Sequence, residues 1–228
     1  MNSVLKRCIP LVFIAFASVS AFSQDSKPDA LKLYNEGNYK ESIKVCEDEI
    51  SANPNNMDSY SVLCWALVAN RQYNEAEQRA IEARKINSYD VRLIEVLGEA
   101  KYYLGKNNEA LNMFQRYIAN VPENGSRVGR VYFYMGEIYI RQARYEHADI
   151  AFTTAVRTEP LRDYWWARLG YSREMTENWK SALSAYNQAL SLNPTQYDAT
   201  RGKARCSVSW IRMWSFICCT KAGRRTLS

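Results

Sequence analysis

The sequence contains few of the residues from which catalytic and metal sites are built. Its 228 residues include 1 histidine, His147. A zinc site or a general base needs several convergent partners, and Glu146 and Asp149 beside this histidine do not supply them. A Gly-rich phosphate loop and a nucleophile elbow are also missing. We therefore predict no enzymatic activity, no cofactor and no metal, and we expect His147 to face solvent.

Glycine, proline and long apolar runs are scarce as well. The chain has 9 glycines and 6 prolines, and no apolar run reaches the ~20 residues of a membrane-spanning helix. With 47% hydrophobic and 24% charged residues it can bury a core, so it is not a disordered chain. The formal charge of +6 arises at the two ends, since residues 8–200 carry 21 basic and 24 acidic side chains. This nearly neutral body predicts no nucleic-acid partner.

Residues 1–23 have the pattern of a cleaved signal peptide. Two basic residues near the start precede an apolar stretch at 9–19, and Ala21 and Ser23 are the small residues of a cleavage site. An uncleaved membrane anchor is the alternative, although the apolar stretch is short for one. A lipid-anchored protein would carry a cysteine just after this stretch, whereas Cys8 precedes it. We expect an exported protein of the periplasm.

A period of 34 residues organises the rest of the chain. The steps from Ala76 to Ala110 and from Ala148 to Ala182 are both 34, whereas the step from Ala110 to Ala148 is 38. Four extra residues, at about 125–128, therefore separate the third unit from the fourth. A fixed period of this size predicts a stack of repeated units.

Each unit is predicted to be a pair of amphipathic helices. In the first helix, two large residues lie three positions apart on one helical face, and a small residue directly follows the second of them, as in Ile94, Leu97 and Gly98. The small residue lets the second helix approach, and we expect the recurring alanine of that helix to fill the space. Prolines follow the second helices, where they end a helix without breaking it. The small residues are Cys64, Gly98, Gly136 and Gly170, the alanines are Ala76, Ala110, Ala148 and Ala182, and the prolines are Pro122, Pro160 and Pro194.

These residues resemble the tetratricopeptide repeat family, whose pattern places W-x2-L-G-x2-Y before A-x3-F and a proline. The resemblance covers about residues 26–206 and implies an all-α, right-handed superhelical solenoid of antiparallel helix hairpins at 24–206. Repeat one is partial, because Pro28 shortens its first helix. The repeats span about 23–56, 57–90, 91–124, 129–162 and 163–196, with a partial sixth at 197–206.

The resemblance also implies a binding surface. In this family the first helices usually line a concave groove that holds a peptide or a helix of a partner protein. Aromatic residues and glutamates at the inward-facing positions would suit a partner with apolar and basic groups. The alternative is that some of the aromatic residues pack between helices. The candidate partner-binding residues are Trp65, Val68, Arg92, Glu95, Glu99, Tyr102, Tyr103, Phe133, Glu137, Arg141, Tyr171 and Glu174.

One binding mode of the family is not expected here. Family members that clamp a C-terminal carboxylate use Lys and Asn at the fifth and ninth positions of a repeat. Those positions hold Ser61 and Trp65 in the second repeat, and Glu95 and Glu99 in the third. A terminal carboxylate would be repelled by the two glutamates.

Two features remain open in the sequence. Removal of the signal peptide leaves five cysteines, of which Cys46 and Cys64 occupy apolar positions and are expected to be reduced core residues. Residues 207–228 are basic and apolar and do not follow the repeat. They could form an unusual cap, lie on a membrane or a partner as an amphipathic segment, or be foreign to the array, as after a change of reading frame.

The sequence thus predicts a non-enzymatic scaffold or adaptor of the cell envelope that binds a protein or peptide in its concave groove. Membrane contact is expected nowhere except at residues 207–228, and the sequence does not predict the oligomeric state. The alternative is an accessory subunit of an envelope transport system that binds a small apolar ligand or a solute-binding protein.

Overall fold

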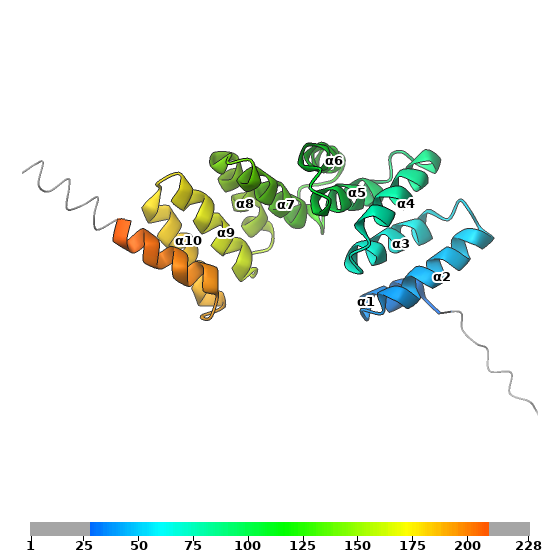
Figure 1. Cartoon of the computed structure of the whole chain (residues 1–228), viewed down its shortest axis with the longest axis horizontal. Coiled ribbons are helices and arrows are strands. Elements are labelled where there is room, and N and C mark those ends of the chain that lie inside the picture. The colour runs from blue at the N-terminus through cyan, green and yellow to red at the C-terminus, as the bar shows by residue number, and fades with distance from the viewer. Residues whose placement is uncertain (1–27, 210–228) are drawn as a thin grey trace, which may run out of the picture.

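The computed structural model describes residues 28–209, and this part of the chain is helical without strands. The helices pair into antiparallel hairpins that follow one another along the long axis of the molecule (Figure 1). After α10 a further helix, which we call the terminal helix, occupies residues 197–209. The helices are α1 (Ala30–Asn35), α2 (Tyr39–Ala52), α3 (Met57–Ala69), α4 (Tyr73–Ile86), α5 (Val91–Tyr103), α6 (Asn107–Asn120), α7 (Val128–Arg141), α8 (Tyr145–Thr158), α9 (Asp163–Met175) and α10 (Trp179–Leu192).

A residue with positive φ forms the turn within each hairpin. Glycine holds this position at Gly37 (φ 83°) and Gly105 (φ 75°), where the left-handed conformation costs little. Arg71 (φ 63°), Ala143 (φ 55°) and Glu177 (φ 58°) adopt it without that advantage. The five positions recur at 34 residues, except for the step of 38 that contains the insertion, so the turn repeats as strictly as the helices do.

The small residues of the first helices give room to an aromatic ring. A Cβ added at any of the three glycines would lie 2.6 Å from a ring carbon of the paired second helix, so only glycine fits without a shift. We expected the recurring alanines to fill this space. The alanines are indeed buried, but the ring four residues further on is what occupies it. The pairs are Gly98 with Phe114, Gly136 with Phe152, and Gly170 with Tyr186.

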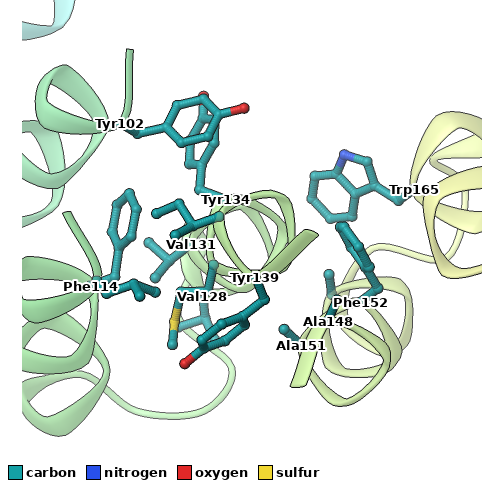
Figure 2. Close-up of a cluster of buried hydrophobic side chains, with 14 of the residues drawn as sticks. Tyr102, Phe114, Val128, Val131, Tyr134, Tyr139, Ala148, Ala151, Phe152 and Trp165 are labelled. Carbon is teal, nitrogen blue, oxygen red and sulfur yellow. The ribbon is translucent and has the colours of Figure 1, made fainter. Parts of the chain in front are cut away.

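Packing of the first helices defines the inner side of the array. α1 contacts α3, α3 contacts α5 and α5 contacts α7, whereas consecutive second helices in residues 28–209 make no contact of comparable extent. We call the side on which the first helices meet the inner face. In the middle of the array α7 lies between Phe114 of α6 and Phe152 of α8, and Tyr102 and Tyr134 lie side by side above it (Figure 2).

The insertion lengthens the connection between α6 and α7. This connection spans residues 121–127, whereas the one between α8 and α9 spans only 159–162. Its backbone turns at Gly125, whose N–H donates to the carbonyl of Pro122 at 2.9 Å. A cavity of about 430 Å³ opens beside it, between α6 and α8, and Ile118, Val121, Tyr132 and Arg157 are among its lining residues. The cavity is therefore lined by α6, the connection, the first turns of α7, and α8, and Tyr102, Phe133 and Tyr134 do not line it.

The terminal helix packs against α10. Ala199, Gly202 and Cys206 are buried, and Gly202 lies against the ring of Tyr186 in α10. Its other side exposes Thr200, Lys203 and Ala204. The helix continues to residue 209, three positions past the predicted partial repeat at 197–206.

Two predicted segments lie outside the described residues. The predicted signal peptide at 1–23 is one of them, and the other comprises residues 210–228 of the predicted tail. Between residues 28 and 209, no helix has the length and apolar character needed to cross a membrane.

Candidate functional site on the inner face

Five aromatic rings form a continuous row along the inner face. Tyr73 of α4 stacks on Tyr103 of α5, with ring centroids 4.5 Å apart, and Tyr103 contacts Tyr134 of α7 at 6.1 Å. Phe133, also on α7, lies 6.0 Å from Tyr134 and 5.9 Å from Tyr164 of α9. We call these five residues the aromatic row. Tyr103 is 44% exposed and Tyr164 is 43% exposed, so the row offers rings to solvent on both sides of α7.

Arg141 lies beside the row, over Tyr102. Its guanidinium lies over the ring of Tyr102, 4.1 Å from the centroid. Its Nη1 donates to the carbonyl oxygen of Tyr102 and to Oδ1 of Asn107, both at 3.2 Å. Tyr102 itself is buried, and this burial raises the pKa of its hydroxyl to about 12. Tyr102 therefore supports Arg141 and is not open to a partner.

Glu95 is buried completely and is held by a residue of the insertion. Nη1 of Arg127 donates to Glu95 Oε2 at 2.8 Å, and the same guanidinium lies 4.5 Å from the ring centroid of Trp65. Burial raises the pKa of Glu95 to about 7; nearby Glu99 adds to this rise, whereas Arg127 and Arg130 oppose it. Within residues 28–209, Oε1 of Glu95 and Nε1 of Trp65 have no hydrogen-bond partner.

The other glutamates of the candidate site are also engaged within the chain. Each accepts a hydrogen bond from a residue of the following unit, 31–35 positions further along the sequence. These carboxylates therefore join adjacent repeats. The pairs are Glu99 with the Tyr134 hydroxyl, Glu137 with Arg168 (3.1 Å between Oε2 and Nη2), and Glu174 with Arg205 (2.8 Å between Oε2 and Nη2).

The remaining candidates differ in accessibility. Val68 is buried, Trp65 is half-buried, and Arg92 forms ion pairs with Asp58 at 2.6 Å and Asp90 at 2.7 Å. The ring of half-buried Tyr171 lies 5.3 Å from the guanidinium of Arg168. Some of the inward-facing aromatic residues therefore pack between helices, whereas others reach solvent.

Two site residues carry little signal in the sequence. Arg127 precedes the regular fourth repeat, so the repeat pattern assigns it no position; only the insertion pointed to that segment. Tyr73 begins a second helix, where the pattern predicts no inward residue. His147, by contrast, is exposed as expected.

Stacked helix hairpins with a 34-residue period and a ring seated against a small residue define an α-helical repeat solenoid. Two family profiles, both described as tetratricopeptide repeat, match residues 30–127 and 133–197 and together cover well over half of the chain. The chain belongs to the tetratricopeptide repeat family. Comparison by sequence with curated proteins found no match.

Solved structures of the same family share the fold. MamA of Desulfovibrio magneticus RS-1 matches with a TM-score of 0.62 at 17% identity, over 74% of this chain and 93% of that one. YrrB, whose structure is described as a TPR protein with an unusual peptide-binding site, matches with a TM-score of 0.61 at 18% identity, over 77% and 88% of the two chains. TTC0263, a TPR protein of Thermus thermophilus, gives 0.58 at 18% identity, over 78% and 95%. The TPR fold supports a protein–protein interaction scaffold, and TPR proteins are typically non-catalytic.

Proposed function

We propose that the protein is an exported, non-enzymatic scaffold that binds a segment of a partner protein along its inner face. The observation that carries the proposal is the aromatic row. Aromatic side chains contribute a large share of the binding energy at protein interfaces, and here they run without a break from α4 to α9.

The partial exposure of the aromatic row supports a role in binding, because rings that only packed the core would be fully buried. Tyr103 and Tyr164 contact their neighbours through one side of the ring and leave over two-fifths of their surface open. A partner segment that covers them would bury apolar surface without displacing any side chain of the core. Open aromatic faces in line also favour an extended or helical peptide over a small enclosed ligand.

The proposed location is the periplasm, on the pattern of residues 1–23. Cell fractionation of the full chain, with mass determination of the processed protein, tests export. A protein that keeps residues 1–23 and stays in the cytoplasmic fraction would contradict this part of the proposal and leave the inner-face interaction intact.

The interaction is tested with a photo-crosslinking residue at position 103 or 164 in cells that make the protein. We expect a specific crosslinked partner from both positions. We expect none from position 150, because Ile150 is more exposed than either tyrosine but lies on α8. The captured partner is then purified and titrated against Tyr103→Ala and Tyr164→Ala.

Each tyrosine substitution should weaken binding by about 1–2 kcal/mol, as for an interface aromatic residue. Tyr89→Ala is the matched control, since Tyr89 is 83% exposed in the connection between α4 and α5. Equal losses for all three variants, or no loss at positions 103 and 164, would contradict binding at the aromatic row.

A further inference from the structure

In three ion pairs of the inner face the carboxylate is more buried than its arginine: Glu95 with Arg127, Glu137 with Arg168, and Glu174 with Arg205. Glu95 is 0% exposed, Glu99 7% and Glu174 9%. The arginine that pairs with Glu174, Arg205, keeps 47% of its side chain exposed. A partner that approaches Arg205 therefore meets this cation before the carboxylate of Glu174, whereas beside Arg92 the carboxylate of Asp58 is the more exposed group, at 84%.

Two arginines of α7, Arg130 and Arg141, form no ion pair within residues 28–209, although the charge of Arg130 lowers the pKa of Glu95. Arg130 forms no ion pair or hydrogen bond there, and Arg141 donates only to uncharged oxygen atoms. They are eleven residues apart, which in an α-helix is three turns and about 20°. Both therefore lie on the same side of α7, about 16 Å from each other along its axis.

Arg141 also has free N–H donors with which to bind an anion. Nη1 makes both of its hydrogen bonds, so among the contacts of residues 28–209 the Nε and Nη2 donors remain free. The ring of Tyr102 holds the plane of the guanidinium from one side. A guanidinium with two adjacent free donors matches a carboxylate in bidentate geometry.

We propose, on the basis of the function above, that the partner segment is acidic: two of its side-chain carboxylates bind Arg130 and Arg141, and apolar side chains between them cover Phe133 and Tyr164. An extended chain spans about 16 Å in roughly five residues, which sets the spacing of the two acidic side chains. The segment need not end in a free carboxylate, because the arginines lie at the second and thirteenth positions of the repeat, away from the fifth and ninth.

The test uses three labelled peptides of about ten residues with amidated C-termini and the same Phe and Leu residues. Their other positions hold Glu, Gln or Lys. Fluorescence anisotropy with the full chain should rank the Glu peptide first, and its affinity should fall as salt is added. In the Arg130→Glu/Arg141→Glu double variant we expect the Glu peptide to bind at least about tenfold more weakly and the Lys peptide to bind better.

Two controls separate charge from folding. Arg130→Lys/Arg141→Lys keeps both charges but loses the bidentate guanidinium geometry, so it should bind the Glu peptide more weakly than the wild type and more tightly than the double Glu variant. Arg116→Glu reverses the charge of an exposed arginine on α6 and should change nothing. Equal binding of the Glu and Gln peptides, with no effect of the arginine variants, would overturn the acidic preference while the proposed scaffold function stands. If no peptide binds and positions 103 and 164 crosslink no partner, both proposals fail.

Discussion

Nη1 of Arg127 lies 2.8 Å from Oε2 of Glu95 and joins the connection before α7 to the buried centre of α5. The pair spans 32 residues of sequence, so it ties the third repeat to the fourth across the inserted residues. Because the Glu95 carboxylate is buried away from water, its ionisation changes the free energy of unfolding of the array.

Stability should fall as the pH rises from about 4.5 to about 7. Over this range the folded state keeps a proton on Glu95, whose pKa is raised from 4.5 to about 7, and the unfolded chain releases it. Glu95→Gln should flatten this part of the profile. Arg127→Met removes the cation that opposes the rise in the pKa of Glu95, so its stability should continue to fall above pH 7. Urea unfolding of the three proteins from pH 5 to 8 measures the effect, and parallel profiles for the wild type and Glu95→Gln would rule it out.

Gly136→Ala should destabilise the protein by about 1–3 kcal/mol, the usual cost of overpacking a core. The added Cβ would meet the ring of Phe152 at 2.6 Å. Urea unfolding measures the loss. Combining the change with Phe152→Leu should recover part of it, because the smaller side chain frees the space; strictly additive losses in the double variant would show that the ring is not the obstacle.

Ala143→Gly should stabilise the protein by about 0.5–1 kcal/mol. Ala143 has φ 55°, a conformation that glycine adopts without the Cβ clash of an L residue, and Gly37 and Gly105 already hold the equivalent turns. Ala204→Gly is the matched control within the terminal helix, where the same change should destabilise by a similar amount. A loss of stability in both variants would contradict the prediction.

The buried cysteines should resist alkylation. Burial raises the pKa of the Cys46 thiol to about 12 and that of Cys206 to about 11, and it raises the pKa of Cys64 as well. The thiolate is the reactive form, so iodoacetamide at pH 8 should leave these three free cysteines unmodified until urea is added. Mass spectrometry of the digested protein reports each position separately, and labelling of Cys46 in the native protein would disprove the prediction.

The terminal helix should contribute to the stability of the array. A chain that ends at Pro194 uncovers Tyr186 and removes the arginine that pairs with Glu174, whereas a chain that ends at Ser209 retains both contacts. We expect the shorter chain to melt about 5 °C lower or more. Equal melting temperatures of the two chains would contradict a stabilising role of the terminal helix.

The repeat pattern was sufficient to predict the hairpins, because period, helix spacing and prolines all recur in each unit. It did not predict which group fills the space beside Gly136, since alanine and phenylalanine of the second helix both face the first. It did not predict the arginines that pair with Glu95, Glu137 and Glu174, because Arg127, Arg168 and Arg205 lie 31 or 32 residues further along the chain and the pairing depends on side-chain reach. Arg127 could not be assigned at all, as it belongs to residues that the period omits.

The irregular connection at 121–127 also bears on how the chain finds its native arrangement. In an array of equivalent hairpins, a helix that slips by one unit meets almost the same surface, so misaligned stacks compete with the native one. Here only one alignment brings Arg127 to Glu95, and any other would bury that carboxylate without its cation, at a cost of several kcal/mol. The inserted connection thus favours the native register of the stacked repeats over shifted registers during folding.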